Sequence, residues 1–314
     1  MAVIKRKIKV DSDSIDKKHL VTLKSLGNIK EISISDRHNS NATIMPISRD
    51  EFILMSTGEV KNFKNHAKSR TENIRNLEKS MRNLADLINT NINIENYDKC
   101  RFITLTYRDN ERNTEKIYND FKNFNKRFKR YIKVRYEYIA TIEVQERGAF
   151  HFHIIYLFAN YPPFIDNEIL FELWDFGFTS VKSLNGTPDN IGEYLTAYLK
   201  NLPVDNEIST ELLGGEIYST NIDGKNKRII KGARLKMLPS GINLYRCSRG
   251  IKKPQTEILT YEEAEKELSE SGYIKVSEFG LEISDTERDF NNKYIKQTYK
   301  KFINKRSKKI EKEI

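Results

Sequence analysis

The stretch that most constrains the fold is residues 148–156, GAFHFHIIY in one-letter code. A short run of aromatic and β-branched residues predicts a buried β-strand. Side chains alternate between the two faces of a strand, so His151 and His153 are expected on the same face, one pleat apart. Two buried imidazoles side by side need polar partners. A packed, hydrogen-bonded pair and a divalent metal site both explain this pattern when it is taken alone.

A second β-rich run, residues 136–145, comes just before this strand. Two such runs joined by a short connection that contains glycine predict an antiparallel hairpin. Across that turn, Glu143 can face the same side as His151 and His153. One carboxylate beside two imidazoles could hold Mg²⁺ or Mn²⁺ and leave positions open for water and a phosphate oxygen. The alternative is that Glu143 points into solvent, in which case Gln145 is the substitute ligand.

Further periodic patterns predict the elements around the hairpin. Residues 100–107 alternate in polarity, which predicts a strand with threonines on one face. Residues 114–130 carry aromatic residues at steps of three and four, typical of a helix that packs through its aromatic stripe. The same aromatics could form a stacking platform for bases, but at helical spacing the core is the preferred interpretation. The expected order is strand, helix, hairpin, helix, strand and helix, over residues 100–107, 114–130, 136–156, 168–174, 179–182 and 191–200.

The last of these helices carries two tyrosines. Asp189 or Asn190 provides a cap, and Tyr194 and Tyr198 follow four residues apart. Residues at this spacing project from one face of a helix, so both hydroxyls could enter the same site. A pair of tyrosines that packs in the core explains the spacing equally simply.

Three short motifs in order resemble those of HUH endonucleases. They are FITLT at residues 102–106, then Glu143 with RG ahead of HFH at 147–153, then YLTAY at 194–198. More narrowly, the chain is similar to rolling-circle replication initiators of plasmids and single-stranded DNA phages. Residues 231–236 and 244–251 also resemble segments of initiators from low-GC Gram-positive bacteria. The motifs cover residues 100–200, and the looser resemblance extends from about residue 55 to 254.

The resemblance implies an α+β protein with a ferredoxin-like or RRM-like antiparallel sheet, the HUH endonuclease fold, and helices packed on it. It also implies that single-stranded DNA is nicked at an origin, with Tyr194 and Tyr198 as nucleophiles and a metal on His151, His153 and Glu143. The product would be a 5′-phosphotyrosine and a 3′-OH primer.

Contacts to the DNA backbone are expected from basic residues in and after the motifs. Many relatives carry a lysine three residues after a catalytic tyrosine, where this chain has Ala197 and Asn201. Lys200 lies one position away from that place. The expected DNA-binding residues are Lys200, Arg234, Lys236, Arg246 and Arg249.

Composition agrees with a polyanionic partner. Lysine and arginine total 54 against 44 aspartate and glutamate, a net charge of +10. Such an excess favours a nucleic acid partner, although it also serves solubility alone. No GxxxxGK[ST] loop is present, so a helicase and a polymerase of the host are expected partners. Only two cysteines occur, no run is apolar enough to span a membrane, and no signal peptide is recognised, so a cytoplasmic location is expected.

Four regions are expected along the chain. They are a weakly structured arm at 1–46, a helical lead-in at 47–99, the catalytic domain at 100–254, and a helical extension with a basic tail at 255–314. Three other functions stay open. They are a related HUH transposase or relaxase, a non-catalytic module with an RRM-like sheet that binds nucleic acid, and an unrelated metallohydrolase with His-x-His on a barrel strand.

Overall fold

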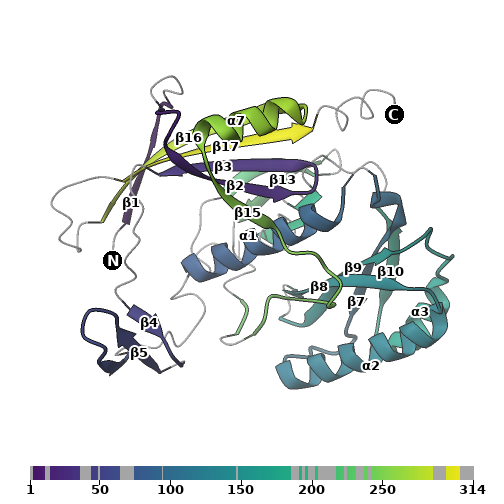
Figure 1. Ribbon diagram of the computed structural model, residues 1–314. Helices are drawn as coiled ribbons and strands as arrows, with labels where there is room; N and C mark the ends of the chain where they lie inside the picture. The colour runs from purple at the N-terminus through teal and green to yellow at the C-terminus, as the bar shows by residue number, and fades with distance from the viewer. Residues whose placement is uncertain are drawn as a thin grey trace. The chain divides into compact units, whose positions relative to one another are not determined.

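The computed structural model divides the chain into two compact units (Figure 1). Unit 1 comprises Met1–Ser25, Ile29–Lys68 and Gln255–Ile314, and unit 2 comprises Leu26–Asn28 and Ser69–Pro254. The structure describes residues 3–10, 15–35, 44–48, 50–63, 74–93, 95–145, 148–184, 191–192, 195–196, 202–203, 217–222, 225–230, 237–239, 242–285 and 295–304. Mixed helices and antiparallel sheets make the fold α+β, as the sequence predicts.

Unit 2 is built on a five-stranded antiparallel sheet in the order β10-β7-β9-β8-β14. The predicted hairpin is confirmed, because β8 pairs with β9 along its whole length. It lies inside the sheet, with β7 on one side and β14 on the other. The strands are β7 (Cys100–Thr106), β8 (Tyr136–Val144), β9 (Phe150–Phe158), β10 (Thr179–Ser183) and β14 (Tyr245–Cys247).

Helix α2 (Thr114–Ile132) covers one face of this sheet (Figure 1). It begins where the Asn113 side chain accepts hydrogen bonds from two backbone N–H groups of the first turn. Its aromatic stripe packs as predicted: the ring centroids of Phe121 and Phe152 lie 4.8 Å apart, and those of Phe128 and Tyr156 lie 4.7 Å apart. The stripe is therefore core, and it is not available to stack on bases.

Helix α3 (Asn167–Trp174) closes the same face and ends at Trp174. The indole of Trp174 is fully buried, and its N–H donates to the carbonyl of Thr106 at 3.0 Å. Burying the indole against Phe152 and Phe124 joins α3 to both the sheet and α2.

Helix α1 (Ile74–Asn91) lies on the other side of the sheet (Figure 1). Its apolar residues recur at helical spacing and are buried, as the sequence predicts. The helix starts later than the predicted lead-in, and residues 60–62 of that range form strand β6 instead. The buried residues are Leu77, Met81, Leu84, Leu87 and Ile88.

Smaller elements complete unit 2. A 3-10 turn, η3 (Tyr97–Lys99), leads into β7. A three-stranded sheet in the order β11-β13-β12 comprises β11 (Leu202–Pro203), β12 (Ile217–Ile222) and β13 (Lys225–Ile230).

Unit 1 contains a six-stranded antiparallel sheet in the order β1-β16-β17-β3-β2-β15. Helix α7 (Tyr261–Glu270) packs on it, and its Ala264 and Leu268 share a buried cluster with Val21 and Ile32. A small sheet, β4-β5-β6, comprises Ile44–Pro46, Glu51–Leu54 and Val60–Asn62. The strands of the larger sheet are β1 (Val3–Ile8), β2 (Leu20–Leu26), β3 (Ile29–Ser35), β15 (Gln255–Thr260), β16 (Tyr273–Asp285) and β17 (Ile295–Asn304).

The expectation of a weakly structured arm and a helical C-terminal extension is wrong for the described residues. The ends of the chain form one sheet: β15 pairs with β2, and β17 pairs with β3. Each strand is short and polar on one side, and its buried partners lie more than 200 residues away. Local periodicity could not detect such a pairing.

The basic tail also differs from its prediction. Lys300 lies within β17 and is only 3% exposed. Its ammonium donates to the hydroxyl of Tyr261 at 2.5 Å and pairs with the carboxylate of Glu278 at 3.2 Å. This lysine therefore holds unit 1 together and is not free to contact phosphates. Among the described residues, no helix has the length and apolar character needed to cross a membrane.

Candidate metal centre

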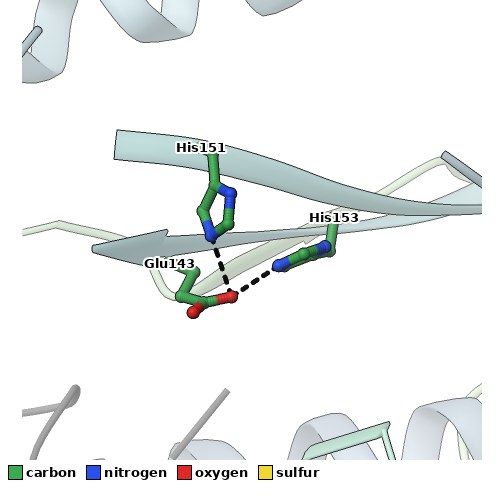
Figure 2. Close-up of side chains that lie close together, drawn as sticks. All are labelled: Glu143, His151 and His153. Carbon is green, nitrogen blue, oxygen red and sulfur yellow. Dashed lines mark hydrogen bonds and ion pairs between the residues drawn. The ribbon is translucent and has the colours of Figure 1, made fainter. Parts of the chain in front are cut away.

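Glu143, His151 and His153 converge on one side of the β8–β9 hairpin, as Figure 2 shows. Glu143 and His151 face each other in register, and His153 is the next residue along β9 on the same face. One carboxylate oxygen of Glu143 lies 2.9 Å from Nε2 of His151 and 2.5 Å from Nε2 of His153. Their ligand atoms all lie within 4.8 Å of one another. We call these residues the triad, and the side of the sheet that carries them the triad face.

The neighbouring strand β7 fixes the orientation of His153. Thr104 lies directly opposite His153, and its hydroxyl is 3.2 Å from Nδ1 of that ring. The ring of Phe102 stacks on the imidazole at a centroid distance of 5.4 Å. With Nδ1 engaged and one ring face covered, Nε2 of His153 points toward Glu143. A hydrogen bond to the second ring nitrogen is the usual way in which proteins orient a histidine ligand.

The protonation state also suits a metal ligand. Burial, together with the neighbouring imidazole of His151, lowers the pKa of His153 well below its usual value. His153 is therefore a neutral imidazole at physiological pH, with a lone pair for a cation. Glu143 and His151 are also buried, at 5% and 8% exposure. Two imidazoles and one carboxylate, converging and shielded, fit a divalent cation by the chemistry of the donor set.

Residues 100–202 match a family of replication-associated proteins, described by the name of its ORF2 member. The match covers less than half of the chain, and it includes β7, the triad and both predicted tyrosines. It supports a replication initiator family, whose members' name points to DNA as the partner. No curated protein was found to match the chain.

Most other predicted site residues cannot be placed beside the triad. Within the family match, the helical residues 191–192 and 195–196 are described, but the tyrosines are not. Arg249 is exposed in the turn after β14. Arg246 lies on β14, but its guanidinium stacks 3.5 Å from the ring centroid of Tyr118 on α2, away from the triad face. The predicted residues outside the described part are Tyr194, Tyr198, Lys200, Arg234 and Lys236.

The start of the tyrosine segment is anchored on α1. The backbone N–H of Gly192 donates to Oδ1 of Asn89 at 2.7 Å, and Asn89 is only 5% exposed. Gly192 also sits so close to α1 that a Cβ there would lie 2.2 Å from the carbonyl oxygen of Ala85. Sequence reasoning missed this contact, although a polar Asn89 directly after the apolar pair Leu87 and Ile88 was a visible signal.

We expect Gly192→Ala to destabilise unit 2 by about 1–3 kcal/mol, because backbone atoms of α1 cannot move aside as a flexible side chain would. Thermal denaturation of the purified variant measures this loss. Gly58→Ala is the matched control for the added methyl group, because nothing lies within 4 Å of a Cβ at that position. Its positive φ of 72° will cost some stability of its own. If Gly192→Ala were as stable as the wild type, the close approach to α1 would be refuted.

Proposed function

We propose that this protein is a rolling-circle replication initiator that nicks single-stranded DNA at an origin. The observation that carries the proposal is the convergence of Glu143, His151 and His153 inside a segment that matches a replication-associated family. The proposal includes an HUH endonuclease fold for the catalytic domain, at residues 100–254. It also includes Tyr194 and Tyr198 as the nucleophiles.

The triad would hold Mg²⁺ or Mn²⁺ on the open side of the hairpin. When bound there, such a cation polarises a non-bridging oxygen of the scissile phosphate. Glu143 supplies the negative charge of the donor set, and Thr104 and Phe102 keep His153 aligned. The aromatic packing on the opposite face holds β8 and β9 rigidly, so the ligands need little reorganisation.

The chemical step is a phosphodiester exchange. A tyrosine oxygen attacks the phosphorus, the bond from phosphorus to the 3′ oxygen breaks, and a 5′-phosphotyrosine forms. The phenol gives up its proton, and the departing 3′ oxygen gains one, so a free 3′-OH is left to prime synthesis. A phenol with an ordinary pKa near about 10 needs assistance to act as a nucleophile at neutral pH. Because the new ester conserves the bond, resealing requires no ATP, and a second tyrosine permits a second exchange.

The proposed DNA contacts follow from position and charge. Arg249 is exposed. We propose that Arg249, Lys200, Arg234 and Lys236 bind the DNA backbone. Because Arg246 stacks on Tyr118, away from the triad face, it is not included among the contacts to the scissile phosphate. Host helicase and polymerase would act on the nicked origin, because the chain carries no nucleotide-binding loop of the GxxxxGK[ST] type.

The decisive experiment is a test for a covalent adduct. The protein is incubated with end-labelled single-stranded oligonucleotides from its own replicon and Mn²⁺, then separated under denaturing conditions. We expect labelled DNA to migrate with the protein, and a chelator to remove the adduct. Binding without any adduct would reject the nicking proposal and favour a non-catalytic nucleic-acid-binding module.

A further inference from the structure

The edge strand β10 extends the triad face. In register, Ser180 of β10 faces Thr104 of β7, and Thr104 faces His153 of β9. Because side chains alternate along a strand, Ser180 and Lys182 lie on the triad face. Thr179 lies on the other face, where it is 1% exposed and its hydroxyl donates to the Asn167 side chain at 3.2 Å.

Phe178 continues this pattern beyond the end of β10. Its carbonyl accepts a hydrogen bond from the backbone N–H of Thr106 at 2.8 Å, which keeps it in the ladder opposite Thr106. Since the preceding face is taken by Thr179, alternation places the Phe178 side chain on the triad face. A cross-strand row results, running from Phe178 through Thr106 and His151 to Glu143.

The Phe178 ring is exposed beside this polar row. It is 64% exposed, whereas the aromatic rings of α2 are buried on the opposite face. Two strand spacings, about 10 Å, separate its backbone position from that of His151. A large exposed ring that close to a cation site is costly in water unless something covers it.

Lys182 supplies positive charge on the same edge. It is exposed and lies in register with Phe102, which stacks on His153. An exposed ring and an ammonium group along one sheet edge match the two halves of a nucleotide, because the base stacks and the phosphate pairs. The net charge of +10 favours the same polyanionic occupant.

We infer that the β10 edge, through Phe178 and Lys182, binds the single-stranded DNA that reaches the triad. The Phe178 ring stacks on a base of a nucleotide near the scissile phosphate, and Lys182 pairs with the backbone. This assignment rests on the proposed function, because it takes the triad as the place where the phosphate is bound. The edge thereby sets the path of the strand across the sheet.

The test measures DNA binding without chemistry. Fluorescein-labelled (dT)20 is titrated with the full-length protein in EDTA, and anisotropy is recorded. We expect Phe178→Ala to weaken binding by about 5- to 150-fold, the loss of one stacked base, and Phe178→Trp to retain it. Phe171→Ala is the matched control, because Phe171 is an exposed ring (44%) on α3, which packs on the opposite face.

Salt dependence separates the two residues. Lys182→Ala should reduce the slope of log affinity against log salt by about 0.7, whereas Phe178→Ala should leave the slope unchanged. An oligonucleotide with 2-aminopurine adds a direct signal, because stacking on Phe178 quenches its fluorescence and the alanine variant should lose that quenching.

Failure of this inference is distinguishable from failure of the proposed function. If Phe178→Ala binds (dT)20 as tightly as Phe171→Ala does, the inference is overturned while adduct formation by the wild type can stand. If the wild type binds no single-stranded DNA at all, both are overturned. Circular dichroism shows that the variants are folded, which the exposure of both rings leads us to expect.

Discussion

Replacing Tyr194 and Tyr198 together with phenylalanine should abolish covalent attachment to DNA. Phenylalanine keeps the ring and its packing but lacks the oxygen that would attack phosphorus. The expected loss is more than about 1,000-fold in the rate of adduct formation, as for removal of other catalytic nucleophiles. Each single variant should retain one attack. A time course of adduct formation on a denaturing gel measures the effect.

The matched control is Tyr161→Phe, which removes an exposed phenol (75% exposure) from the same unit. Its adduct yield should equal that of the wild type. Mn²⁺ affinity should be unchanged in all of these variants, because no tyrosine belongs to the triad. Undiminished attachment in the double variant would end the assignment of these nucleophiles, whatever the metal does.

Removing a triad residue should abolish metal binding and nicking together. Glu143→Gln keeps the shape of the side chain but removes the only negative charge of the donor set, and His151→Ala removes one imidazole. We expect Mn²⁺ affinity to fall by at least about 100-fold in each, since replacing even a supporting residue can cost that much. Titration calorimetry measures the affinity, and the adduct assay measures the nicking.

Metal-linked stability gives a second measure that does not depend on activity. Ligands that bind only the folded state raise the melting temperature, by about 2.7 kcal/mol of stabilisation at one hundred times the dissociation constant. Mn²⁺ should therefore stabilise the wild type but not the triad variants. His19→Ala is the control, because His19 lies in unit 1 with its Nε2 2.8 Å from the carbonyl of Ser35. Equal stabilisation of Glu143→Gln and the wild type by Mn²⁺ would refute the triad as the metal site.

The sequence alone determined the hairpin and the face that its histidines share. A two-residue period in residues 150–156 and a glycine in the connecting turn are local features, so they predict the strand, its partner and the side of Glu143. The aromatic stripe of α2 was predictable for the same reason, since helical spacing places Phe121, Phe124 and Phe128 on one side. Each of these features depends on neighbours within a few residues along the chain.

Only the tertiary structure decided which distant segments meet. The pairing of β2 with β15 and of β3 with β17 joins the two ends of the chain, and it turns Lys300 into a buried structural residue. The same holds for the Thr104 hydroxyl beside His153 and for the Asn89 side chain beneath Gly192. The physical reason is that strand pairing and close packing are selected by the burial of surfaces far apart in sequence, and local periodicity contains no information about the partner.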